Sequence, residues 1–145
     1  MRLWHKDLIE ALPREQLVAQ WRELSAIAGN INTKGTPNHI LVNKVMNYPM
    51  EHFISYAWHV RHEMTRRGYR TMDSVWNKIL QTQEVDYGDY HVLPIEDLFP
   101  NWHNEKYIRQ CIYNLEEKYD CGGITEEAFE KIIRVYKEKY IDKLD

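Results

Sequence analysis

The chain has 145 residues, of which 43% are hydrophobic and 28% are charged, a composition typical of globular proteins. This length supports one core and not two, so we expect a single domain over residues 1–145. No apolar run approaches the roughly 18–20 residues that a membrane span needs, and no signal peptide opens the chain, so we expect a cytoplasmic protein.

The charge of the chain is unevenly distributed around a formal net charge of −3. Residues 1–70 hold ten Lys and Arg against six Asp and Glu, whereas residues 71–145 hold nine against sixteen. A basic face in the N-terminal half is compatible with phosphate binding, with the acidic half facing away. Ordinary charge asymmetry explains the same counts equally well. The two cysteines, Cys111 and Cys121, are interpreted as packing residues, because a disulfide is unusual in a cytoplasmic chain.

Residues 1–12 form a short N-terminal arm, and the first amphipathic helix follows it over residues 13–28. Pro13 suits the first turn of this helix, where its missing N–H is not needed. The apolar residues of the helix recur at helical spacing and should face the core; they are Leu17, Trp21, Leu24 and Ala28. Gly29 and Asn30 predict its end. Arg22 and Glu23 lie beside the apolar stripe, at the rim of any pocket.

Two more helices are expected before residue 70. Residues 38–46 carry four apolar side chains at near-helical spacing and predict a short helix; they are Ile40, Leu41, Val45 and Met46. Residues 50–67 carry the strongest helical pattern of the chain and predict a central buried helix, which Gly68 terminates.

The second half of the chain continues the helical pattern. Helices are expected over residues 72–80 and 104–119, with an irregular wrap over residues 81–100 between them. Thr125 is a good N-cap for a last helix. No convincing strand alternation is present. The predicted fold class is all-α: a single compact domain of five or six helices with an ordered N-terminal arm.

Two motifs in the first quarter of the chain resemble a known family. The first is Leu17-x-Ala19-x-Trp21-Arg22-Glu23-Leu24, and the second is the opening Met1-Arg2-Leu3-Trp4-His5. Together they resemble the pyrimidine-dimer DNA glycosylase family of the phage endonuclease V type, and above all a bacterial branch whose members open Met-Arg-Leu-Trp-His. The likeness extends to Met64–Tyr69 and, more faintly, to Gly88-Asp89-Tyr90.

The resemblance implies a DNA repair glycosylase with AP-lyase activity that acts on damaged double-stranded DNA without a cofactor or metal. The N-terminal α-amine would attack sugar C1′ and form an imine, with Glu23 assisting. An α-amine in general has a pKa of about 7.7–8.0, so a useful fraction is neutral and nucleophilic. A large residue at position two generally prevents removal of the initiator Met. We therefore expect Met1 to supply the amine, next to Arg2.

Five basic side chains are candidates for DNA contacts: Arg2, Arg22, His59, Arg66 and Arg67. Arginine suits bidentate phosphate contacts. The pair Arg66–Arg67 could instead cap the C-terminal end of its helix, and Arg22 with Glu23 could form ordinary surface ion pairs. Trp4 and Trp102 are candidates to stack on a base.

Two alternatives to the glycosylase remain open. The first is a non-catalytic nucleic-acid-binding relative that keeps the fold but not the excision chemistry, because the phage enzymes carry His where this chain has Gln16 and Arg where it has Ala26. The second is a small metal-dependent hydrolase. His59 with His62 or Glu63 has the spacing for two ligands on one helix face, and His39 or His103 would supply a third. The glycosylase itself is expected to be a monomer.

Overall fold

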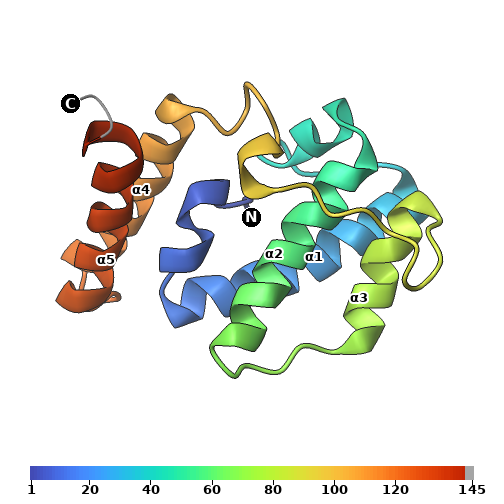
Figure 1. Ribbon diagram of the computed structural model, residues 1–145, viewed down its shortest axis with the longest axis horizontal. Coiled ribbons are helices and arrows are strands. Elements are labelled where there is room, and N and C mark those ends of the chain that lie inside the picture. The colour runs from blue at the N-terminus through green and yellow to red at the C-terminus, as the bar shows by residue number, and fades with distance from the viewer. Residues whose placement is uncertain (143–145) are drawn as a thin grey trace.

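The computed structural model describes residues 1–142 of the protein, which contain five α-helices and no strand (Figure 1). The α-helices are α1 (Arg14–Lys34), α2 (Met50–Arg66), α3 (Asp73–Leu80), α4 (Glu105–Asp120) and α5 (Glu126–Tyr136). Short 3-10 segments lie between them, namely η1 (Lys6–Ala11), η2 (Asn43–Asn47), η3 (Gln81–Gln83) and η4 (Ile95–Asp97), and a π-helical turn, η5 (Lys137–Ile141), extends α5. The all-α prediction is confirmed.

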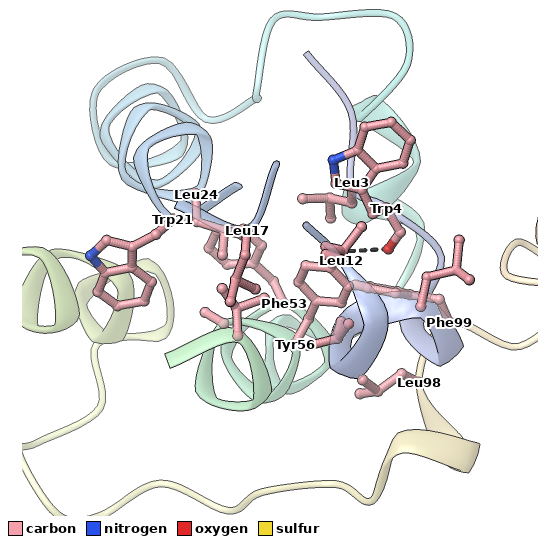
Figure 2. Packing of buried hydrophobic residues seen from close by; sticks show 14 of the residues in the cluster. Leu3, Trp4, Leu12, Leu17, Trp21, Leu24, Phe53, Tyr56, Leu98 and Phe99 are labelled. Atoms are coloured by element: carbon pink, nitrogen blue, oxygen red, sulfur yellow. Dashed lines mark hydrogen bonds between the residues drawn. The ribbon is translucent and has the colours of Figure 1, made fainter. Parts of the chain in front are cut away.

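The helices form two groups on either side of the N-terminal arm (Figure 1). Helix α1 packs against both α2 and α3, and α5 packs against α4 and η1. The core between the arm, α1 and α2 is built from large side chains such as Leu17, Phe53 and Tyr56, each 0% exposed (Figure 2). This burial of apolar area is the main force that holds the arm and the helices together.

Helix α1 is longer than the sequence predicted. It continues past Gly29 for five residues and ends at Gly35, whose φ of 76° is the left-handed conformation typical of a helix terminus. Gly29 is tolerated inside the helix because the side chain of Lys78 packs there, 3.1 Å from where a Cβ would lie. The buried Ile31 continues the apolar face, which outweighs the cost of about 1 kcal/mol for an interior glycine.

The short helix predicted over residues 38–46 is wrong. A hydrogen-bonded turn occupies residues 40–42 and is followed by η2. Val42 and Val45 are buried at the three-residue spacing of a 3-10 helix, whereas Ile40 is 84% exposed. The positive φ of Asn38, 58°, directs the chain into this turn instead of a helix.

Two smaller expectations are also corrected, one on the cysteines and one on the tryptophans. Cys111 is buried, as expected of a packing residue, but Cys121 is exposed. Trp4 and Trp102 are buried at 7% and 6% exposure, so neither ring presents a free face to a base. No helix within residues 1–142 is long and apolar enough to cross a membrane.

Candidate active site

The arm at the start of the chain is fixed by one buried side chain of α1, Gln20. Its Oε1 accepts a hydrogen bond from the Trp4 backbone nitrogen at 2.8 Å, and its Nε2 donates to the Arg2 carbonyl oxygen at 2.9 Å. These two backbone groups point to the same edge of an extended chain, so one amide satisfies both. Gln20 is 0% exposed, and such a buried amide is stable only when its hydrogen bonds are made. It therefore determines the register of the arm on α1.

Two tyrosines hold the same arm from other helices. The Tyr56 hydroxyl, on α2, donates to the Trp4 carbonyl oxygen at 2.6 Å, the contact drawn as a dashed line in Figure 2. The Tyr107 hydroxyl, on α4, donates to the Leu3 carbonyl oxygen at 2.5 Å. Burial raises the pKa of both phenols well above 10, so both remain neutral donors. Three helices thus fix three successive residues of the arm.

Glu23 lies beside the first peptide bond of the chain. Its Oε2 is 3.4 Å from the backbone nitrogen of Arg2 and 3.4 Å from Nε2 of Gln20. Gln20 is therefore bonded to the arm and to the carboxylate at once. The next backbone nitrogen toward the N-terminus is the α-amine of Met1, one residue away, and consecutive Cα atoms are about 3.8 Å apart. The α-amine is thus one residue away, along the chain, from the nitrogen that contacts the Glu23 carboxylate.

The arginines on either side of this carboxylate differ in their surroundings. The Arg2 guanidinium lies 5.2 Å from the centroid of the Trp4 ring, a cation–π distance, and the residue is half-buried. Arg22 is exposed on the outer side of α1. Met1 is 40% exposed. The structure therefore places the Arg2 backbone, next to Met1 in the chain, against Glu23 at a surface that solvent can reach.

The other candidates for DNA contacts lie elsewhere. Arg66 and Arg67 are ten and eleven residues beyond Tyr56 on α2, about 15 Å along the helix axis. Both pair with Glu63, at 2.5 and 2.7 Å, and Arg67 also donates to the backbone oxygens of Leu12 and Glu10. These bonds go to the Glu63 side chain and to carbonyl oxygens at the end of η1, so the Arg67 side chain joins α2 to η1 and does not cap the last carbonyls of its own helix.

The two arginines change the pKa of the Glu63 carboxyl group. Its partial burial alone would raise the pKa of the carboxyl group. The hydrogen bonds and charges of Arg66 and Arg67 outweigh burial and lower the pKa of Glu63 below its ordinary value. The cluster is therefore ionised and closely paired, and it ties the end of α2 to η1.

His59 is half-buried and its Nε2 lies 2.8 Å from the Leu93 carbonyl oxygen. It lines a groove of about 620 Å³ between η1, α2 and η5. Neither Met1 nor Glu23 lines this groove. No group of three or more potential metal ligands comes together anywhere in residues 1–142, so the two-histidine motif of α2 lacks a third ligand there.

The sequence interpretation missed the three side chains that build the site. Gln20 lies three residues after Leu17, on the core-facing side of the helix, and a polar residue at such a position was the available signal of a buried amide. Tyr56 was expected only as one residue of the central buried helix over residues 50–67. Tyr107 is 104 residues from Leu3 in the chain, and no local pattern reveals such a contact.

Comparison with known proteins gives a family match for the N-terminal half of the chain. The family model described as pyrimidine dimer DNA glycosylase matches residues 1–77, just over half of the sequence. No curated protein and no solved structure matches the chain. The matched stretch contains Met1, Gln20, Glu23 and Tyr56, whereas Tyr107 lies outside it.

Proposed function

Because the chain belongs to the pyrimidine dimer DNA glycosylase family, we propose that it excises a damaged base from double-stranded DNA and then cleaves the strand at the abasic site. The α-amine of Met1 is the nucleophile and Glu23 assists it. The observation that carries this proposal is the 3.4 Å contact between the Arg2 backbone nitrogen and Oε2 of Glu23.

The chemistry proceeds in two stages. First the neutral amine attacks C1′ of the sugar, the C1′–N bond to the base breaks, and the base departs with a proton. The amine loses its protons as the sugar ring opens, which leaves an imine at C1′. Second, a proton leaves C2′ and the 3′-phosphate departs, which breaks the strand. A carboxylate such as Glu23 stabilises the positive charge that develops on the sugar and accepts protons.

Lys6 is the nearest competing amine in the sequence. Its residue is 8% exposed, and its Nζ donates to the carbonyl oxygens of Leu98 and Glu96 at 2.6 and 3.0 Å. Burial lowers the pKa of Lys6, which favours a neutral amine, but both carbonyls must be released before this nitrogen can attack. The exposed Met1 requires no such rearrangement, and this supports the α-amine as the nucleophile.

The phosphates beside the damaged nucleotide need cationic partners. Arg22 is exposed next to Glu23, and Arg2 adjoins the amine, so both suit contacts to the flanking phosphates. Displacing the nucleotide from the duplex costs a few kcal/mol and is easiest at damaged sites. We assign Arg66 and His59 to contacts with phosphates farther along the DNA backbone. Arg67 would make a further phosphate contact from its position beside Glu63.

The proposal is tested by borohydride trapping on a duplex with one abasic site. Borohydride reduces an imine to a stable amine, so imine chemistry produces a covalent protein–DNA adduct. We expect an adduct with the protein that has a free N-terminus and none after its α-amine is acetylated. A UV-irradiated duplex tests whether a pyrimidine dimer is the lesion.

The absence of an adduct, with the protein folded and Met1 free, would contradict the excision chemistry. If the same protein still binds the abasic duplex, the non-catalytic relative is the correct interpretation. The replacement of the phage-type His and Arg by Gln16 and Ala26 favours that second candidate.

A further inference from the structure

The segment that joins α1 to α2 has an unusual charge. Between Glu23 and Glu51 the chain contains no acidic residue, although Asp and Glu outnumber Lys and Arg over the whole sequence. The same stretch carries Lys34 and Lys44, both exposed. A surface without carboxylates and with two lysines can approach a phosphate backbone without repulsion.

Within this segment, the turn at residues 39–43 is held by its own hydrogen bonds. The nitrogens of Val42 and Asn43 donate to the His39 carbonyl oxygen at 3.0 and 2.9 Å. The His39 nitrogen in turn donates to Oδ1 of Asn43 at 3.0 Å, and the Leu41 nitrogen to Nδ1 of His39 at 3.3 Å. These bonds give the turn a defined shape.

The turn presents aliphatic side chains to solvent. Ile40 is 84% exposed and Leu41 is 49% exposed, whereas Val42 directly after them is 0% exposed and anchors the turn in the core. Folding alone favours the burial of aliphatic side chains, but Ile40 and Leu41 gain no stability from burial within this chain. Two adjacent exposed aliphatic residues on a fixed turn indicate a contact with something outside the protein.

The turn lies on the side of the molecule where the chain begins. In Figure 1 the segment between α1 and α2 passes close to the N-terminus, and in Figure 2 the same segment arches over the arm that carries Leu3 and Trp4. A duplex bound at Met1 and Glu23 would therefore have its neighbouring base pairs within reach of residues 39–43.

We propose that Ile40 and Leu41 form an apolar wedge that inserts between base pairs beside the displaced nucleotide of the bound duplex. This rests on the proposed function, because the duplex must first bind at the arm. Apolar wedges unstack base steps and kink DNA, and lysines next to them hold the backbone. The wedge stabilises the distorted duplex, which lowers the cost of exposing the sugar to the amine. Lys44 contributes affinity without unstacking.

The test uses a fluorescent base next to an abasic analogue. A duplex with a tetrahydrofuran abasic site and 2-aminopurine beside it brightens when the fluorescent base loses its stacking. The proteins compared at saturating concentration are the wild type, Ile40→Ala/Leu41→Ala, Lys44→Ala and Met72→Ala. Met72 is the matched control because it is 67% exposed and lies just before α3, away from the arm.

We expect the wild-type, Lys44→Ala and Met72→Ala proteins to give the full increase in fluorescence, with Lys44→Ala requiring more protein. The double variant should give less than about half of it. In borohydride trapping the double variant should lose at least tenfold in rate on the duplex and less than twofold on the single strand, which needs no unstacking.

A full fluorescence increase with the double variant, or an equal loss of trapping on duplex and single strand, would overturn the wedge. The failure of the proposed function has a different signature. In that case the wild type forms no adduct on either substrate, and the fluorescence comparison still decides whether Ile40 and Leu41 unstack the duplex.

Discussion

Oε1 of Gln20 lies 2.8 Å from the backbone nitrogen of Trp4, and this contact positions the start of the chain against Glu23. Replacing Gln20 by Leu leaves that nitrogen and the Arg2 carbonyl without partners. We expect a loss of about 1–3 kcal/mol in the free energy of unfolding, measured by urea denaturation, together with slower adduct formation.

Gln16→Leu is the matched control for this change. Gln16 is also buried on α1, one turn earlier, but its Oε1 has no hydrogen-bond partner among the described residues. Removing an unsatisfied polar group should be neutral or stabilising. Equal effects of the two substitutions would show that Gln20 acts as general packing and not as the anchor of the arm.

Tyr107 ties the arm to α4, so Tyr107→Phe should loosen the arm while keeping the ring. The Leu3 carbonyl then lacks its donor, and we expect a loss of about 1–2 kcal/mol in the free energy of unfolding. Amide hydrogen exchange of residues 2–4 should accelerate. Tyr113→Phe, on the same helix and 64% exposed, should change neither quantity. If both variants behave as wild type, the arm does not depend on α4.

Glu23→Gln separates the charge of Glu23 from its hydrogen bonds. A glutamine Oε1 still accepts from the Arg2 nitrogen, so the arm should keep its position. Loss of the negative charge should slow adduct formation and strand cleavage by about 10²–10³-fold, while duplex affinity stays within a few-fold. Glu15→Gln, exposed in the first turn of α1, serves as the control. An unchanged rate in Glu23→Gln would remove the carboxylate from the mechanism.

Stability should depend on pH through a buried histidine pair. The rings of His5 and His103 lie side by side with centroids 5.1 Å apart and planes tilted by 30°. Burial, which outweighs the charge of Asp7, lowers the pKa of His5 to about 4, and burial followed by the charge of His5 lowers the pKa of His103 well below 6.5. The folded protein thus binds fewer protons than the unfolded chain below the ordinary pKa of 6.5.

The stability that the neutral pair contributes should therefore be fully present above pH 6.5. The free energy of unfolding should decrease as the pH falls from 6.5 toward 4. Urea denaturation at a series of pH values measures this slope. His91→Gln, which replaces an exposed histidine outside this pair, serves as the control. A flat profile between pH 4 and 6.5 would contradict the neutral state of the buried pair.

Arg67 and Arg66 should differ when each is replaced by Ala. Arg67 loses bonds to Glu63, Leu12 and Glu10, and we expect about 1.5–3 kcal/mol of destabilisation. Arg66 is more exposed, so its replacement should destabilise the protein less than the replacement of Arg67 does. If Arg66 contacts phosphate, its loss weakens DNA binding uniformly and reduces the salt dependence by about one ion. Similar destabilisation by both substitutions would contradict the role of Arg67 in joining α2 to η1.

Local pattern was sufficient for much of the fold. The helix predicted over residues 50–67 is observed as α2, and Thr125 is the N-cap of α5, accepting from the Ala128 nitrogen. These elements are encoded by apolar periodicity and capping chemistry, which act within a few residues. Gly29 misled the prediction because its packing partner, Lys78, comes from another helix.

The candidate site was predictable only in part, for the same reason. Family resemblance indicated Met1 and Glu23, and in the structure Glu23 contacts the backbone nitrogen of Arg2, the residue after Met1. Gln20 and Tyr107, which fix that geometry, act through bonds that join distant parts of the chain. Ile40 is exposed because it lies in a turn. The near-helical spacing of the apolar residues predicted a helix there instead.

The identity of the amine that carries the DNA is the central claim, and mass spectrometry of the borohydride-trapped adduct tests it most directly. Cleavage before Asp7 releases residues 1–6, which contain the α-amine of Met1 and the side chain of Lys6. Fragmentation of this peptide assigns the added mass to one nitrogen or the other. We predict that the sugar remnant is found on the α-amine of Met1. A remnant on Lys6, or on any peptide outside residues 1–6, would contradict the account.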